Sequence, residues 1–318
     1  MSKLQVARAL LRAGKPIVVA THPRSGTHLT IDLLRRHFRP CRSWKFPGEQ
    51  LQSLYLNLDA LLPDHDNRLS VSGALRYLRR VERPIIKTHA LPDFSPWSNG
   101  LADWRAWIRN GADVIYVVRD GRDVICSYHA LMMTLADSAG TCSISQFMHQ
   151  ADPGFVPGPR QQTSRVALWA DHVKSWLTMP HLELFQFEQM LSRPDEALQR
   201  LAMKLSYRPQ GVSPVLPKAF HSLWQSRWAR LLGMRPHSTA IVPQGWRLHN
   251  ARWREDFNED DKTFFDDQAG DVMEALGYGT FGQKPECDQA TEQLIERIRL
   301  VRDRQDDLQA PIRLAGRY

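Results

Sequence analysis

Four basic side chains, placed where three short apolar runs end, are the residues of this sequence best suited to chemistry. They are Arg24, Lys87, His89 and Arg119. Three of them carry a positive charge at neutral pH, whereas a histidine, whose ordinary pKa is about 6.5, can take up and release a proton. Such a set describes a cationic pocket with one titratable base. It suits a phosphorylated ligand and a nucleophile that must lose a proton.

The first apolar run leads into a loop that is suited to bind an anion. Residues 16–20 are rich in β-branched side chains and predict a buried parallel strand, and residues 27–38 predict a helix. A strand, a tight turn and a helix N-terminus present N–H groups and the positive end of the helix dipole. The residues of this cradle are Arg24, Ser25, Gly26, Thr27 and His28.

This loop differs from the nucleotide-binding loop of NTPases, which has two glycines and a lysine directly before Ser or Thr. Here Gly26 is followed by Thr27, and the cation stands two residues before the glycine. We interpret the loop as a cradle for a phosphate or a phosphosulfate. The alternative is an ordinary strand-to-helix turn in which Ser25 or Thr27 caps the helix.

Two further apolar runs bring basic residues to the same place. Residues 84–89 predict a strand that ends in Lys87 and His89. Residues 113–118 predict a strand that is followed by Arg119 and by a helix over 122–133 that holds Ser127. Arg119 and Ser127 could contact one phosphate. The alternatives remain a structural histidine at position 89, a lysine that reaches out to solvent, and a serine that bonds back to its own helix.

The rest of the chain predicts an α/β fold in which strands alternate with helices. A fourth strand is expected over 182–187, with helices over 69–80, 101–109, 164–177, 188–205 and 260–276. This alternation predicts a P-loop-like open parallel sheet of about five strands with helices on both faces. Ligands of such sheets bind at the carboxyl ends of the strands, where the basic residues stand.

The composition along the chain indicates its domain boundaries and its irregular segments. We expect one domain over residues 1–318, with a charged C-terminal helix and tail over 288–318. Residues 39–66, 134–163 and 208–250 are expected to be irregular. Residues 40–80, 134–163 and 208–250 are expected to shape the binding site of a second substrate.

Charge and cysteine content narrow the class of protein. The chain of 318 residues has 42 basic and 34 acidic residues and a net charge of +8, which favours an anionic ligand and leaves nucleic acid open. Its four cysteines lack the spacing of a metal site or a disulfide framework. No apolar run is long enough to span a membrane. We therefore expect a cytoplasmic protein without a metal.

Three blocks of the sequence resemble the sulfotransferases that use 3′-phosphoadenosine 5′-phosphosulfate (PAPS). The blocks are residues 21–27, 86–92 and 115–128, and a fainter similarity covers 253–278. The resemblance implies that the first block holds the 5′-phosphosulfate, with Arg24 in place of the usual lysine. It implies that His89 is the catalytic base, and that Arg119 and Ser127 hold the 3′-phosphate.

The sequence also departs from that family around the adenine. Leu29 stands where the family often has an aromatic residue, and the tyrosine that usually follows the fourth strand is missing at 186–189. The family's Arg-Lys-Gly segment is replaced at 246–248, where Arg247 could take over the contact of the lysine with the 3′-phosphate.

The resemblance implies sulfuryl transfer from PAPS to a hydroxyl or amine acceptor by in-line attack, with adenosine 3′,5′-bisphosphate (PAP) as the leaving product. His89 would remove the acceptor proton, and Arg24 and Lys87 would stabilise the leaving phosphate without a metal. The expected acceptor is a small molecule or a carbohydrate, and nucleic acid is not expected. The alternatives are a P-loop kinase or NTPase, and a non-catalytic protein that binds an anion or nucleic acid. The sequence does not indicate an oligomeric state.

Overall fold

The computed structural model describes most of the chain. The described residues are 3–44, 51–61, 69–93, 102–135, 142–152, 163–210, 239, 251–282 and 296. The chain forms two compact units. The first unit contains Met1–Arg119, Asp152–Gln161 and His181–Asn250, and the second contains Asp120–Ala151, Gln162–Pro180 and Ala251–Tyr318. The single domain over 1–318 stays a prediction. The expected tail over 288–318 lies outside the described residues except for Glu296.

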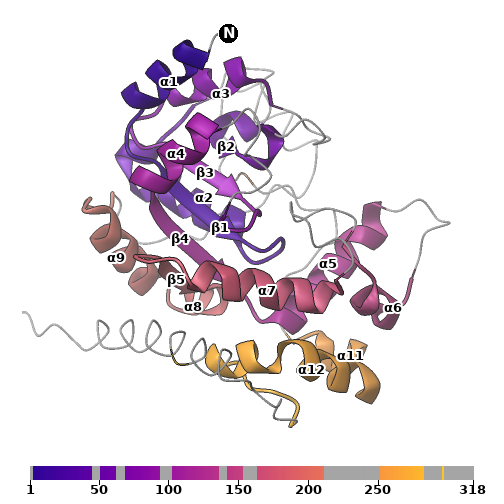
Figure 1. Cartoon of the computed structure of the whole chain (residues 1–318). Coiled ribbons are helices and arrows are strands. Elements are labelled where there is room, and N and C mark those ends of the chain that lie inside the picture. Colours follow the sequence, from indigo (N-terminus) through magenta and orange to yellow (C-terminus); the bar gives the residue numbers. More distant parts are fainter. Residues whose placement is uncertain are drawn as a thin grey trace, which may run out of the picture. The chain divides into compact units, whose positions relative to one another are not determined.

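The first unit is built on a five-stranded sheet in the order β2-β3-β1-β4-β5, shown in Figure 1. The strands are β1 (Ile17–Thr21), β2 (Leu56–Asn57), β3 (Ile85–Thr88), β4 (Asp113–Val118) and β5 (Glu183–Gln186). All four neighbouring pairs are parallel. This confirms the predicted α/β fold with an open parallel sheet, and it places the carboxyl ends of the strands along one edge.

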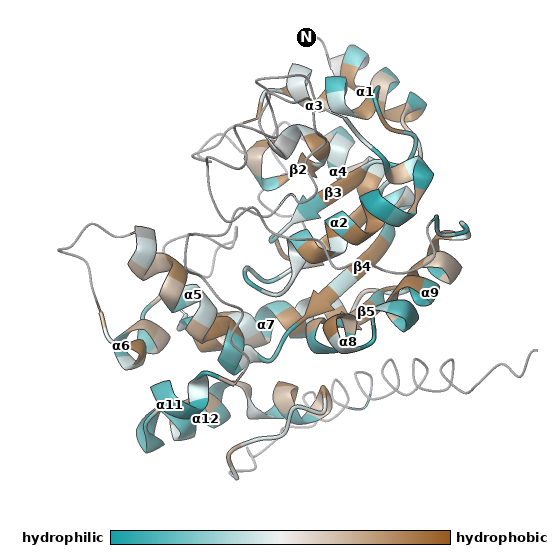
Figure 2. Ribbon diagram, turned by 180° about the vertical axis from the view of Figure 1, so that it is seen from behind, coloured by the Kyte–Doolittle hydropathy of each residue, from teal (hydrophilic) through white to brown (hydrophobic). Residues whose placement is uncertain are grey.

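The central strands form because both of their faces are buried. All five residues of β1 are buried, and the apolar run that predicted it is typical of a strand with no solvent-exposed face. Figure 2 shows the same apolar character along β4 and at the start of β3. β2 was not predicted, because it has only two residues and lies in the segment 39–66 that was expected to be irregular. Two short 3₁₀ turns flank it, η2 (Leu51–Leu54) and η3 (Asp59–Leu61).

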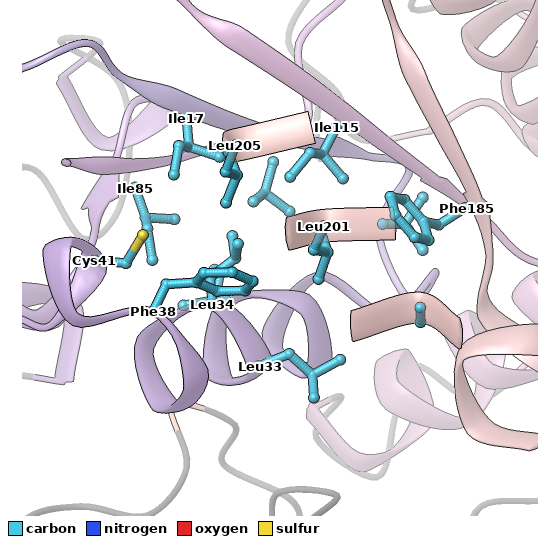
Figure 3. Packing of buried hydrophobic residues seen from close by; sticks show 14 of the residues in the cluster. Ile17, Leu33, Leu34, Phe38, Cys41, Ile85, Ile115, Phe185, Leu201 and Leu205 are labelled. Carbon is cyan, nitrogen blue, oxygen red and sulfur yellow. The ribbon is translucent and has the colours of Figure 1, made fainter. Parts of the chain in front are cut away.

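One face of the sheet packs against α2 (Thr27–His37), α8 (Phe187–Ser192) and α9 (Pro194–Leu205). Its core holds alternate residues of the strands together with the apolar sides of these helices; Ile17, Ile115, Phe185, Leu34 and Leu201 are among them (Figure 3). Each is at most 1% exposed. Complete burial of such a side chain contributes about 1.5–3 kcal/mol, so this core holds the cradle loop between β1 and α2 in place.

The intervening strand residues point to the other face and are buried as well: Val18, Ile86, Tyr116 and Leu184 are at most 2% exposed. Three more helices of this unit are α1 (Lys3–Arg12), α3 (Val71–Leu78) and α4 (Ala102–Gly111), and α1 packs against both others. The hydroxyl of Tyr77 on α3 accepts the N–H of Ile85 at 2.9 Å, which ties this helix to β3. A short 3₁₀ turn, η1 (Arg39–Cys41), follows α2.

The second unit is helical in its described part. It contains α5 (Gly121–Leu135), α6 (Ile144–His149), α7 (Arg165–Leu177), α11 (Trp253–Asp256) and α12 (Glu259–Ala275). α7 packs against α12, and Lys174 pairs with Asp271 at 2.6 Å. The helices predicted over 122–133, 164–177 and 260–276 are confirmed. α6 corrects the expectation of an irregular segment over 134–163; its capping box at Ser143 went unrecognised.

Candidate active site

The cradle between β1 and α2 has the backbone that the sequence predicted. Gly26 is the N-cap of α2 with φ 102°, and no side chain caps the helix. The alternative in which Ser25 or Thr27 is the N-cap is therefore wrong. A Cβ at Gly26 would lie 2.5 Å from the ring of Phe187, so only glycine fits here. Arg24 also has a positive φ, 70°, which is uncommon for a residue with a side chain.

Polar groups of the cradle are available to an anion. The N–H groups of the first helical turn have no carbonyl partner within their own helix. The hydroxyl of Ser25 is completely buried, and among the described residues it has no hydrogen-bond partner. A buried hydroxyl without a partner is costly, and a bound phosphate oxygen would supply the missing bond.

Two guanidinium groups meet beside this loop. Arg119, which directly follows β4, donates from Nη1 to the carbonyl of Arg24 at 3.3 Å and lies 4.9 Å above the ring of Phe187. Burial, together with the charge of Arg119, lowers the pKa of Arg24 to about 10. Arg24 therefore remains charged at neutral pH. Two like charges at close range favour the binding of an anion between them.

His89 has a defined tautomer. Its Nδ1 lies 2.7 Å from the carbonyl oxygen of Thr21. Because a carbonyl only accepts hydrogen bonds, Nδ1 carries the proton, and Nε2 is the nitrogen of the neutral imidazole that accepts one. The hydroxyl of Thr21 lies 3.3 Å from the same Nδ1 and 2.6 Å from the hydroxyl of Thr27. This chain of contacts joins the imidazole directly to the cradle.

Lys87 and His28 complete the electrostatic environment. Burial lowers the pKa of Lys87, and the charge of Asp59 opposes that shift. His28 has its pKa lowered to about 3, first by burial and then by the charges of Lys87 and Arg24. It is therefore neutral at physiological pH, and its Nδ1 lies 3.0 Å from the hydroxyl of Thr239. The charges of Lys87 and Arg24 thus both act on His28.

The structure thus brings most of the predicted site residues together in the first unit: Arg24, Ser25, Gly26, Thr27, His28, Lys87, His89 and Arg119. Ser127 lies half-buried on α5 in the second unit, and its role stays a prediction. Arg247 lies outside the described residues.

Sequence reasoning missed two residues of the site, Thr21 and Asp59. Thr21 opens the block 21–27 that resembles the family's phosphosulfate loop, but no role was assigned to its hydroxyl or its carbonyl. Asp59 follows the unpredicted strand β2, and its carboxylate accepts the N–H of His89 at 2.9 Å. Only the register of β2 against β3 could have placed it there.

Two searches of the described part of the chain give negative results. It contains no group of three or more histidine, cysteine, aspartate or glutamate side chains that could hold a metal ion. None of its helices is both long enough and apolar enough to cross a membrane.

Comparison with solved structures finds sulfotransferases of low sequence identity. A mouse sulfotransferase complexed with PAP is 16% identical, with 93% of this chain and 94% of that chain covered and a TM-score of 0.48. A sulfotransferase from Alicyclobacillus acidocaldarius is also 16% identical, with coverages of 84% and 97% and a TM-score of 0.44. Comparison with curated protein sequences finds no significant match.

A family model gives the decisive comparison. The model described as the sulfotransferase domain matches residues 15–210, which is more than half of the chain. The matched segment holds the cradle at 24–28, the base candidate His89 and the arginine that follows β4. With this match over the residues that build the site, the chain belongs to the sulfotransferase domain family.

Proposed function

We propose that this protein transfers a sulfuryl group from PAPS to a hydroxyl or amine acceptor, with His89 as the general base. The observation that carries the assignment is the imidazole of His89, whose Nδ1 is held at 2.7 Å by the carbonyl of Thr21 at the edge of the cradle. An imidazole fixed in this tautomer offers Nε2 to an acceptor proton. Because the chain belongs to the sulfotransferase family, we infer that the transferred group is a sulfuryl group.

The donor would be held by its phosphates. The 5′-phosphosulfate would accept hydrogen bonds from the N–H groups at the start of α2 and from the buried hydroxyl of Ser25. Arg24 and Lys87 would add positive charge on either side of it. We assign Arg119, with Ser127 and Arg247, to the 3′-phosphate. Contacts with a second phosphate would distinguish PAPS from nucleotides that lack one.

The reaction itself would be an in-line displacement at sulfur. A lone pair of the acceptor oxygen or nitrogen forms the new bond to sulfur while the bond between sulfur and the bridging phosphate oxygen breaks. Nε2 of His89 takes the acceptor proton, and the electron pair of the broken bond stays on PAP. Arg24 and Lys87 stabilise this growing negative charge, which is the task that fixed cations perform best in a site with little water.

The proposal extends to the second substrate and the setting. The acceptor is a small molecule or a carbohydrate, nucleic acid is not a partner, and the protein works in the cytoplasm. We assign the charge-stabilising role to arginine and lysine, so turnover needs no divalent metal. A P-loop kinase or NTPase would instead need one.

Two measurements test this function. Calorimetric titration should show PAP binding at least about tenfold more tightly than AMP, since only PAP has the 3′-phosphate, and a tenfold ratio corresponds to 1.4 kcal/mol. Transfer of radioactive sulfate from PAPS to panels of phenols, alcohols, amines and sugars should proceed equally with EDTA or Mg²⁺. Equal affinity for PAP, AMP and ATP, or turnover of ATP that requires Mg²⁺, would overturn the proposal.

A further inference from the structure

Asp59 lies beside the proposed base although no sequence motif marks it. It opens η3, two residues after β2 ends. Asn57 of β2 stands opposite Lys87 in the parallel register, and the N–H of Leu58 donates to the carbonyl of Lys87 at 2.9 Å. Two residues further along both strands, this register brings Asp59 level with His89.

Both oxygens of the Asp59 carboxylate accept hydrogen bonds from the strand end that carries His89. Oδ1 accepts from the hydroxyl of Thr88 at 2.9 Å, and Oδ2 accepts from the N–H of His89 at 2.9 Å. The hydroxyl of Thr88 in turn accepts the N–H of Ala90 at 3.0 Å. One carboxylate therefore holds the backbone N–H of His89 directly and that of Ala90 through the hydroxyl of Thr88. Asp59 is only 4% exposed, so water competes little for these bonds.

The charge of Asp59 acts on a second member of the site. Lys87 is half-buried, and burial disfavours its charged form; the charge of Asp59 counteracts this effect. A buried carboxylate is tolerated only where hydrogen bonds and an opposite charge compensate its desolvation. Asp59 has both: Thr88 and the proposed base His89 donate the hydrogen bonds, and Lys87, which would stabilise the leaving phosphate, supplies the opposite charge.

We propose that Asp59 is a positioning residue of sulfuryl transfer, which fixes the backbone that carries His89 and places a negative charge near Lys87. This inference rests on the function proposed above. Asp59 itself contacts neither the donor nor the acceptor in this role. It acts through the two side chains whose placement and charge the reaction needs.

The key comparison uses Asp59→Asn and Asp59→Glu. The amide of asparagine keeps one acceptor oxygen but loses the charge and the second acceptor, whereas glutamate keeps the charge on a longer side chain. We expect kcat per PAP-binding site to fall about 10²-fold in Asp59→Asn, the cost of a small misplacement of a catalytic group, with the PAP dissociation constant unchanged. Asp59→Glu should recover part of this loss.

The pH dependence of kcat separates the effect of Asp59 on the charge of Lys87 from its effect on the position of His89. Within the part of the chain that the structure describes, Asp59 from η3 and His28 from α2 interact electrostatically with Lys87, and His28 also interacts with Arg24. His28 is neutral above about pH 3, so it does not change charge in the measured range. Removal of the negative charge of Asp59 lowers the pKa of Lys87 further. The basic limb of the profile of kcat should therefore move to lower pH in Asp59→Asn and stay in place in Asp59→Glu.

A matched control is Asp266→Asn in α12. Asp266 is 1% exposed and accepts the N–H of Phe281 at 2.7 Å, so it is also a buried carboxylate bonded to backbone. Its variant should lose stability but keep kcat per PAP-binding site. If Asp59→Asn behaved like this control, with kcat and the basic limb unchanged, Asp59 would be a structural residue only and the inference would be wrong.

A second readout does not depend on turnover. In protein labelled with ¹⁵N-histidine, and with signals assigned through His89→Asn, the backbone amide of His89 should lose its downfield shift in Asp59→Asn. If the wild-type protein transferred no sulfate at all, the proposed function would fail, whereas this spectrum would still decide whether Asp59 fixes His89. An unchanged amide signal would overturn the positioning role.

Discussion

The hydroxyl oxygens of Thr21 and Thr27 lie 2.6 Å apart, and this contact connects the end of β1 with the first turn of α2. Thr21 also accepts the Nδ1–H of His89 with its backbone carbonyl at 2.7 Å. The same residue therefore orients the proposed base and supports the proposed donor site. A displacement of either would be transmitted to the other through this one residue, which uses its carbonyl for His89 and its hydroxyl for Thr27.

The first prediction concerns His89. His89→Asn should lower kcat by about 10²–10⁴-fold, the usual contribution of a general base, because an amide does not take up a proton at neutral pH. The dissociation constant of PAP should stay the same, since His89 would face the transferred group rather than the phosphates. Steady-state assays and calorimetry measure the two quantities.

His149→Asn is the matched control, because His149 is exposed on α6 in the second unit. Its kcat should equal that of the wild type. Near-full activity of His89→Asn would refute the assignment of the base and leave the donor site untouched.

The second prediction concerns discrimination between nucleotides by Arg119. Arg119→Gln removes the guanidinium that we assign to the 3′-phosphate. Hydrogen bonds to charged groups contribute about 1.5–3 kcal/mol, so PAP should bind about 10- to 100-fold more weakly. The affinity for AMP, which lacks that phosphate, should change much less. Equal losses for PAP and AMP in calorimetric titration would mean that Arg119 does not contact the 3′-phosphate.

The third prediction concerns the glycine of the cradle. Gly26→Ala would force a Cβ to within 2.5 Å of Phe187 at a φ of 102°. Strain of this kind costs about 1–3 kcal/mol, so the midpoint of thermal unfolding should fall and PAP should bind more weakly. Gly111, in α4, is the control, because nothing lies within 4 Å of a Cβ built there and its φ is not positive. Gly111→Ala should not lower the midpoint.

Much of this arrangement could be predicted from the sequence because its signals are local. Apolar runs at 16–20 and 113–118 predicted β1 and β4, and the glycine before Thr27 predicted a turn into a helix. Parallel strands then place their carboxyl ends together, which correctly grouped Arg24, His89 and Arg119. The family expected from three sequence blocks is confirmed by the match over 15–210.

The contacts that could not be predicted are those that depend on register or on buried geometry. β2 is too short to give a periodic pattern, so Asp59 had no visible neighbour in β3. The tautomer of His89 depends on a backbone carbonyl of another strand, and a carbonyl carries no sequence information. The choice of Gly26 as N-cap depends on the ring of Phe187, which comes from a helix far along the chain.

The fourth prediction concerns the dependence of stability on pH. Burial is the main cause that lowers the pKa of His22 to about 4 and that of His28 to about 3, from an ordinary value of 6.5. The folded protein therefore binds fewer protons than the unfolded chain between these values. Each such histidine makes the free energy of unfolding fall by up to about 1.4 kcal/mol for each pH unit below 6.5.

The stability that these two neutral histidines contribute is fully present above pH 6.5. It is lost as the pH falls toward 4 for His22 and toward 3 for His28. Thermal unfolding followed by circular dichroism between pH 7.5 and 4.5 should show a falling midpoint in the wild type. His28→Gln, which cannot take up this proton, should show a smaller slope, and the exposed His149→Gln should retain the wild-type slope. Identical slopes for all three proteins would show that His28 does not enter the fold as a buried neutral imidazole, and the electrostatic picture of the cradle would need another source for its pH response.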